Sequence, residues 1–173
     1  MKKLHLKFIV AMAFFCASQT VTGQQKPTEQ TQASPQTYTV ALKTAAGKYI
    51  SMVPNGGLAG NGAEISAKQI FTVIDLNGGT LVNGDKVKIA HGNTLWREDK
   101  EKNILHRVPA RGAKDEECTF RVRVKGKTIL LETPSGKFVT VSADGKTLET
   151  REKPDEATTL EAVPAPAPTV PVK

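Results

Sequence analysis

The chain has 173 residues, with 24 Lys and Arg against 17 Asp and Glu, and its formal net charge is +7. This length allows a single domain with tails, and a hydrophobic content of 39% excludes a wholly disordered chain. Two cysteines exclude a disulfide-dense scaffold, and 14 Gly with 10 Pro favour turns over long helices. The positive charge suggests a nucleic acid or an anionic membrane as partner, unless the cations lie outside the folded part.

Residues 1–23 have the three parts of a secretory signal peptide. Lysines precede an apolar run over residues 8–16 (FIVAMAFFC), which is too short to cross a bilayer as a helix. Residues 21–23 (VTG) then offer the side chains of a cleavage site. We expect cleavage near Gly23 and a secreted or periplasmic protein of bacterial type; the alternative is a buried N-terminal helix. Cleavage removes three lysines and lowers the net charge from +7 to +4.

Cys16 leaves a lipoprotein as an alternative form of export. A lipidated cysteine normally follows a small residue, and the bulky Phe15 stands before Cys16 here, so the sequence favours cleavage without lipidation. The mature chain then keeps only Cys118, which cannot form an internal disulfide. Because Cys118 lies beside Phe120 in a segment that we interpret as a strand, we expect a buried, unreactive thiol.

The rest of the chain divides into a linker, a domain and a tail. Residues 24–37 are polar and read as a flexible linker, and residues 164–173 form a Pro-rich tail that cannot make a core. Between them, residues 38–163 contain short runs of alternating apolar residues, such as TFRVRV over residues 119–124, separated by Asn-Gly and Asp-Gly turns. This pattern predicts an all-β sandwich or barrel without long helices.

An internal repeat refines this prediction. Residues 40–52 align without gaps on residues 129–141, and a weaker copy covers residues 87–97. Three pseudo-repeats of about 42 residues, each with about four short strands, account for the domain. Three such units can close a barrel around a pseudo-threefold axis, so the sequence predicts a β-trefoil.

The repeat also resembles a known family. The motif VALKTAAGKYIS over residues 40–51 with Phe71, and the motif ILLETPSGKFVT over residues 129–140 with Leu160, are similar to fascin-like β-trefoil domains. The resemblance covers nearly all of the domain and implies a fold, because the motif residues belong to the core and the turns. Actin bundling by eukaryotic fascins requires four such domains in tandem, so actin binding stays a remote alternative.

Several kinds of site have no support in the sequence. Gly47-Lys48 and Gly136-Lys137 lack the spacing of a phosphate loop, and we expect these glycines to adopt positive φ in hairpin turns. His91 and His106 match no zinc pattern, and no acid–base pair or nucleophile dyad is apparent. The cations of residues 100–114 are interrupted by acids and have no stacking aromatics. We therefore expect no enzyme, metal, cofactor, nucleic acid or membrane span, and a monomeric protein.

The remaining prediction is an exported, non-catalytic recognition module whose loops bind a glycan or an extracytoplasmic protein. The longest departure from the repeat, residues 98–114, is the first candidate loop, and residues 55–62 are the second. The aromatics are predicted to be core, but an exposed Trp96 would suit a sugar. A protein-interaction or protease-inhibitor module is the alternative. The candidate ligand-binding residues are Trp96, Arg97, Glu98, Lys102, His106, Arg107, Arg111, Asn55 and Asn61.

Overall fold

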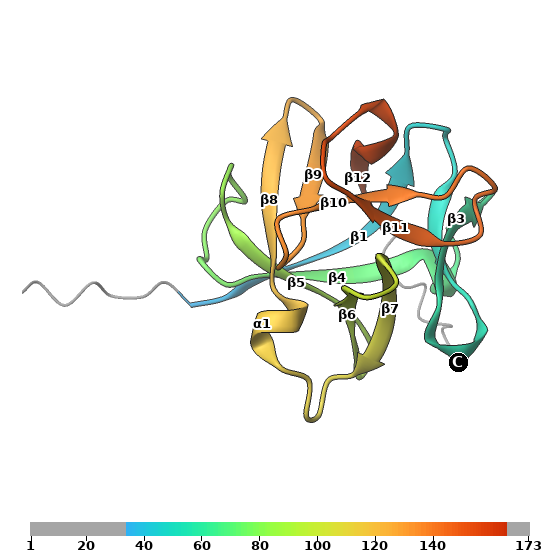
Figure 1. Cartoon of the computed structure of the whole chain (residues 1–173). Helices are drawn as coiled ribbons and strands as arrows, with labels where there is room; N and C mark the ends of the chain where they lie inside the picture. Colours follow the sequence, from blue (N-terminus) through green and yellow to red (C-terminus); the bar gives the residue numbers. More distant parts are fainter. Residues whose placement is uncertain (1–33, 166–173) are drawn as a thin grey trace, which may run out of the picture. The chain divides into compact units, whose positions relative to one another are not determined.

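The computed structural model describes residues 34–165, and it is built almost entirely from β-strands (Figure 1). The predicted signal peptide, most of the predicted linker and most of the Pro-rich tail lie outside the described residues. The strands in chain order are β1 (Gln36–Thr44), β2 (Tyr49–Met52), β3 (Leu58–Gly62), β4 (Ile70–Asp75), β5 (Lys86–His91), β6 (Thr94–Asp99), β7 (Ile104–Pro109), β8 (Phe120–Lys125), β9 (Thr128–Glu132), β10 (Phe138–Val141), β11 (Leu148–Arg151) and β12 (Leu160–Pro164).

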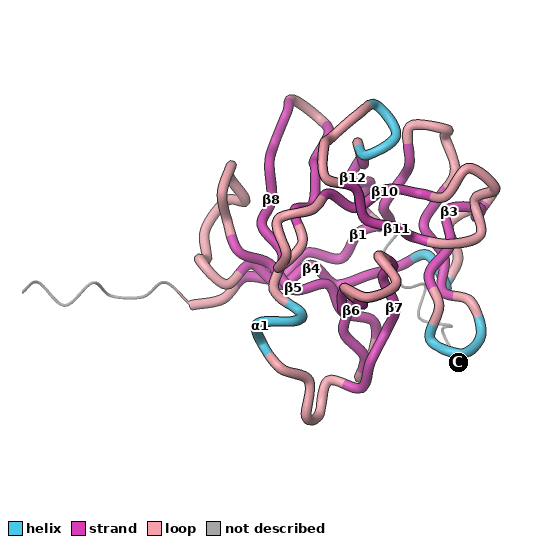
Figure 2. Tube along the Cα trace, in the orientation of Figure 1, coloured by secondary structure: helices cyan, strands magenta, loops and turns pink. Residues whose placement is uncertain are grey.

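Within residues 34–165, helical structure is limited to single turns (Figure 2), as the sequence predicts. These turns are η1 (Pro54–Gly56), η2 (Ala67–Gln69), α1 (Asp115–Cys118) and η3 (Glu156–Thr158). Two of them begin with a capping box, formed by Ser66 with Gln69 in η2 and by Asp155 with Thr158 in η3. Within residues 34–165, no helix has the length and apolar character needed to cross a membrane.

The strands close into an antiparallel barrel of nine strands, which corrects the predicted β-trefoil and the fascin-like assignment. The order β10-β11-β7-β6-β5-β4-β1-β12-β9 returns to β10 through the pairing of Phe138 with Glu132. Strands β2, β3 and β8 are additional: β2 and β3 extend from β1, and β8 pairs with both β5 and β9.

The three sequence copies are unequal in their pairing, which gives this correction its physical basis. Strand β11 pairs with β7 through Glu149 and Ile104, so the second and third copies join in one ladder. Strand β3 of the first copy stays outside that ladder, and Gly57, just before β3, forms an isolated bridge with His106 of β7. Repetition in sequence therefore predicted the strands and turns but not how the sheet closes.

The barrel interior is filled by the inward side of the alternating strands. In β4, for example, Phe71 and Val73 are buried while Thr72 between them is half-buried. The rings of Phe71 and Trp96 meet edge to face with centroids 5.2 Å apart. The aromatics that were predicted to be core are confirmed as buried at Phe71, Trp96, Phe120 and Phe138, and Tyr49 is half-buried.

Candidate functional site

Trp96 lies in the core rather than on the surface. Its side chain is 0% exposed, and it packs against Phe71 inside the barrel. A ring in this position cannot stack on a sugar, so the structure removes Trp96 from the candidate binding residues. The indole Nε1 has no hydrogen-bond partner among the described residues.

The segment over residues 98–114, interpreted from the sequence as a charged loop, is largely a hairpin of β6 and β7. Arg97 lies opposite His106 in this hairpin, and its Nη2 donates to His106 Nε2 at 3.0 Å. Its Nη1 lies 3.5 Å from Glu117 Oε2. Burial, reinforced by the Arg97 guanidinium, lowers the pKa of His106 below its ordinary value. The side chains of Arg97, His106 and Glu117 therefore contact one another, and none of them lines the large pocket described below.

Glu98 and Arg107, two further candidates, also act within the fold. Glu98 is 5% exposed, and its carboxylate binds the turn between β9 and β10. Arg107 donates from Nη1 to Met52 Sδ at 3.2 Å and from Nη2 to the Val53 carbonyl at 3.2 Å. These contacts join segments that are distant in the sequence, so both residues have a positioning role in this structure.

The remaining loop candidates are spread over the surface. Asn55 lies in η1 with a positive φ of 57°, and Arg111 is exposed between β7 and α1. Lys102 is exposed and lies 3.4 Å from Asp99. Cys118 is fully buried, as predicted, although it ends α1 rather than lying in a strand. Burial raises the pKa of its thiol, which disfavours the reactive thiolate.

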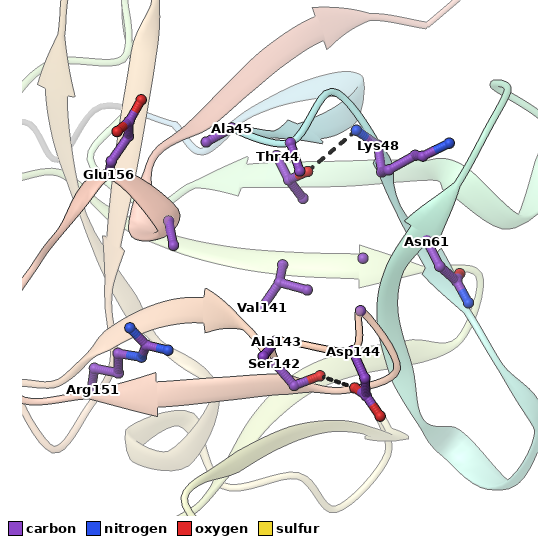
Figure 3. Close-up of a pocket in the computed structure, with 14 residues that line it drawn as sticks. Thr44, Ala45, Lys48, Asn61, Val141, Ser142, Ala143, Asp144, Arg151 and Glu156 are labelled. Carbon is purple, nitrogen blue, oxygen red and sulfur yellow. Dashed lines mark hydrogen bonds between the residues drawn. The ribbon is translucent and has the colours of Figure 1, made fainter.

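A large pocket among the described residues lies elsewhere, and of the predicted residues it contains only Asn61 (Figure 3). Its volume is about 670 Å³. Five segments line it: the β1–β2 turn, the end of β3, the β10–β11 turn, the end of β11 and the start of η3. The lining residues are Thr44, Ala45, Ala46, Lys48, Gly60, Asn61, Val141, Ser142, Ala143, Asp144, Gly145, Arg151, Glu156 and Ala157.

A close backbone approach forms one wall of this pocket. The Gly60 N–H donates to the Gly145 carbonyl at 2.9 Å, which ties β3 to the β10–β11 turn. A Cβ at position 60 would lie 2.5 Å from Val141 Cγ1, so only glycine fits there without movement. The glycine-rich run over residues 56–62 is therefore largely strand β3, which is hydrogen-bonded to the β10–β11 turn. Those glycines and the Asp144-Gly145 turn were the sequence signals for this site, but the sequence does not show that they meet.

The pocket carries charges of both signs around an apolar centre. In Figure 3, Val141 lies in the middle, with Arg151 and Glu156 on one side and Lys48, Asn61 and Asp144 on the other. Arg151 is paired with Asp155 at 2.7 Å. In the part of the chain that the structure describes, Lys48 and Glu156 have no ion-pair partner within 4.0 Å. This lining suits a polar ligand that both donates and accepts hydrogen bonds.

Asp144 is held inside the β10–β11 turn. Its Oδ1 accepts from the Lys146 N–H at 3.0 Å and from Ser142 Oγ at 2.7 Å. The Lys146 backbone bond, followed by the Ser142 hydroxyl, lowers the pKa of Asp144. Because its hydrogen bonds lie within the turn, this carboxylate shapes the rim of the pocket.

The β1–β2 turn that lines the pocket has a counterpart elsewhere in the molecule. We call residues 44–48 the open turn and residues 133–137, between β9 and β10, the filled turn. In the open turn the Thr44 N–H donates to the Lys48 carbonyl at 2.7 Å, and in the filled turn the Thr133 N–H donates to the Lys137 carbonyl, also at 2.7 Å. Gly47 and Gly136 have φ values of 76° and 84°, which confirms the predicted positive φ.

The two turns differ in what their polar groups bind. The filled turn holds the Glu98 carboxylate through Thr133 Oγ1 at 3.0 Å, the Ser135 N–H at 3.1 Å and Ser135 Oγ at 2.5 Å. The open turn has Ala46 in the place of Ser135 and faces the pocket, whose one large apolar lining residue among those described is Val141.

Comparisons with known proteins bear on the fold alone. No family model matches the chain, so nothing supports the fascin-like resemblance, and no curated protein matches it either. Among the 224 solved chains that resemble the structure is a Caenorhabditis elegans protein described as having unknown function. It has a TM-score of 0.62 and 9% identity, and the match covers 79% of this chain and 98% of that one. At this identity the likeness shows a shared fold and says nothing of a ligand.

Proposed function

We propose that the protein is an exported, non-catalytic recognition module that binds its ligand in the pocket beside the open turn. The observation that carries the proposal is the pocket itself, which combines about 670 Å³ of space with Lys48, Asn61, Glu156 and the apolar Val141. Ligand sites on β scaffolds are commonly built from turns in this way. Export rests on the signal peptide predicted for residues 1–23.

A binding role fits this lining better than a catalytic one. Acid–base catalysis needs two titratable groups in different environments that face one reacting centre. Within residues 34–165, the groups with shifted pKa values are Asp99, His106, Cys118 and Asp144, and only Asp144 lines the pocket. Its pKa is lowered by bonds inside its own turn, which serve to order the turn.

A blocking substitution tests whether ligands use this pocket. Ala143 is exposed at the rim, so Ala143→Trp should fill the space without disturbing the core. We expect the mature protein to give hits on a glycan array or in a pull-down, and the variant to lose them. Ala67→Trp, an equally large change at an exposed residue of η2, should keep them. Equal binding by the wild type and Ala143→Trp would overturn the proposed site.

A protease-inhibitor role is the second candidate, and the exposed Arg111 favours it. Arg111 lies on the connection between β7 and α1, which is tied back by the Ala110 N–H to the Asn93 carbonyl at 2.8 Å. A braced loop with an exposed arginine could occupy the specificity pocket of a trypsin-like protease. Inhibition of trypsin that is lost in Arg111→Ala would support this role, and an absence of inhibition by the wild type would exclude it for trypsin.

A further inference from the structure

The filled turn shows which chemical group this turn conformation can bind. Its Thr133 hydroxyl, Ser135 N–H and Ser135 hydroxyl converge on the carboxylate of Glu98, a residue 5% exposed. A buried carboxylate requires such donors, because an ionised group without them carries a large desolvation cost. The turn is thus a carboxylate-binding unit that the molecule occupies with its own side chain.

The open turn has the same backbone conformation as the filled turn. It keeps two of the three donors, which are the threonine hydroxyl and the backbone N–H two residues later. Thr44 corresponds to Thr133, and its side chain belongs to a residue only 8% exposed that lines the pocket. Thr44 Oγ1 accepts from the Lys48 N–H at 3.3 Å, as Thr133 Oγ1 does from the Lys137 N–H at 3.2 Å. Among the described residues, neither the Thr44 hydroxyl proton nor the Ala46 N–H has an acceptor. The same two donors in the filled turn are bound to Glu98.

We propose that the open turn binds the carboxylate of an acidic sugar, in the manner in which the filled turn binds Glu98. This inference rests on the proposed function, since it assigns the ligand class of the same pocket. The Thr44 hydroxyl and the Ala46 N–H donate to the carboxylate oxygens. Lys48, which belongs to the same turn and lines the pocket, adds a positive charge to it.

The other charges of the pocket are compatible with an anion at the turn. Asp144 Oδ1 is occupied by the Lys146 N–H and the Ser142 hydroxyl, whereas its Oδ2 accepts no hydrogen bond from the described residues, and Glu156 lies across the pocket from Lys48 in Figure 3. These acids are acceptors for the hydroxyl groups of the same sugar, whose ring lies over Val141. A uronic acid offers this combination of one carboxylate and several hydroxyls.

The geometry of β3 favours a sugar over an acidic peptide. An extended peptide that binds beside a sheet commonly adds a strand to a free sheet edge, where its backbone groups find partners. Next to the pocket, the Gly60 N–H on that edge already donates to the Gly145 carbonyl. A peptide backbone laid along β3 would therefore lose this hydrogen bond or leave its own groups unpaired, whereas a sugar carries no such ladder.

The test compares sodium glucuronate with glucose by NMR titration of the mature protein, following the Ala46 and Lys48 amides. We expect glucuronate to bind and glucose to bind at least about tenfold more weakly, since a charge-assisted hydrogen bond contributes about 1.5 kcal/mol or more. Equal affinities for the two sugars would overturn the carboxylate assignment. Tighter binding of the dipeptide Ala-Glu than of glucuronate would overturn the assignment to a sugar.

Three substitutions at the open turn locate the interaction. Thr44→Val should weaken glucuronate binding about tenfold, and Thr44→Ser should retain it because the hydroxyl remains. Ala46→Ser copies Ser135 of the filled turn, supplies the third donor and should tighten binding about threefold or more. Circular dichroism and unfolding curves check that each variant is folded.

The outcomes separate this inference from the proposed function. If Ala143→Trp abolishes glycan or protein binding while Thr44→Val and Ala46→Ser leave the glucuronate affinity unchanged, the pocket remains the site and the carboxylate assignment fails. If glucuronate binding is unaffected by Ala143→Trp, the ligand lies elsewhere and both proposals fail.

Discussion

The open turn and the filled turn share their backbone hydrogen bonds but differ in the groups that their side chains and amides bind. In the filled turn, three donors from Thr133 and Ser135 surround the Glu98 carboxylate. In the open turn, Thr44 and Ala46 face a pocket instead. The difference arises outside the turns, because a β6 acid reaches one of them and Val141 of β10 lies beside the other.

This comparison shows how a repeated element can serve stability at one position and recognition at another. The filled turn uses its donors to fix β6 against the β9–β10 connection, so its carboxylate cannot be displaced without cost. The open turn keeps its donors available in a conformation that the rest of the fold already enforces. A preformed turn loses little entropy when a ligand binds, which favours recognition.

The largest effect should come from removing the carboxylate of the filled turn. Glu98→Ala deletes three hydrogen bonds and leaves a cavity beside Thr133, so we expect the free energy of unfolding to fall by about 3 kcal/mol. Urea unfolding measures the change. Glu101→Ala, an exposed acid in the connection between β6 and β7, should stay within about 0.5 kcal/mol of the wild type. A similar loss in both variants would contradict the role given to Glu98.

Chemical rescue would sharpen the same prediction. Acetate supplies a carboxylate without the rest of the side chain, and a ligand that binds only the folded state raises stability by mass action. Sodium acetate should therefore stabilise Glu98→Ala more than it stabilises the wild type, with sodium chloride at equal ionic strength as the reference. An equal response of the two proteins would mean that the turn does not hold a free carboxylate.

A smaller effect should follow from pushing apart the two segments that wall the pocket. Gly60→Ala places a Cβ 2.5 Å from Val141 Cγ1, and this overpacking should lower the free energy of unfolding by about 2 kcal/mol. Val141 is the residue that must yield, so the double variant Gly60→Ala with Val141→Ala should recover more than half of the loss. Additive losses in the double variant would show that the strain lies in the backbone instead.

The sequence predicted the local structure well because that structure depends on short patterns. Alternation in residues 119–124 predicted a strand, which the structure has as β8, and the glycines at 47 and 136 predicted turns with positive φ. Closure of the barrel depends on pairings between distant strands, such as β7 with β11, which neither alternation nor repetition encodes. The prediction of three equal units failed at that step.

The candidate site was harder to predict, for a related reason. Charged and aromatic residues drew attention to Trp96, Glu98 and Arg107, but in the structure these side chains are buried or hydrogen-bonded within the fold. The pocket is made from turn residues such as Thr44 and Ala46, whose significance appears only beside the filled turn. Glu98, a polar residue that departs from the repeat, was interpreted as a functional residue. In the structure its carboxylate instead binds the filled turn, which is itself part of the repeat.

The smallest effect concerns the acid sensitivity of the hairpin that carries Glu98. His106 lies beside Arg97 on that hairpin, and burial together with Arg97 lowers its pKa below the ordinary value of 6.5. The unfolded chain then binds a proton more readily than the folded one, so stability is greatest above pH 6.5 and falls as the pH drops toward the lower pKa of the folded state.

Unfolding curves at pH 7.5 and at pH 5 should differ more for the wild type than for His106→Gln. The other titratable groups that act on His106 are Asp99, which limits the effect by raising its pKa, and Lys102, which adds to the lowering. If His106→Gln retains the full difference between the two pH values, the acid sensitivity does not originate at His106.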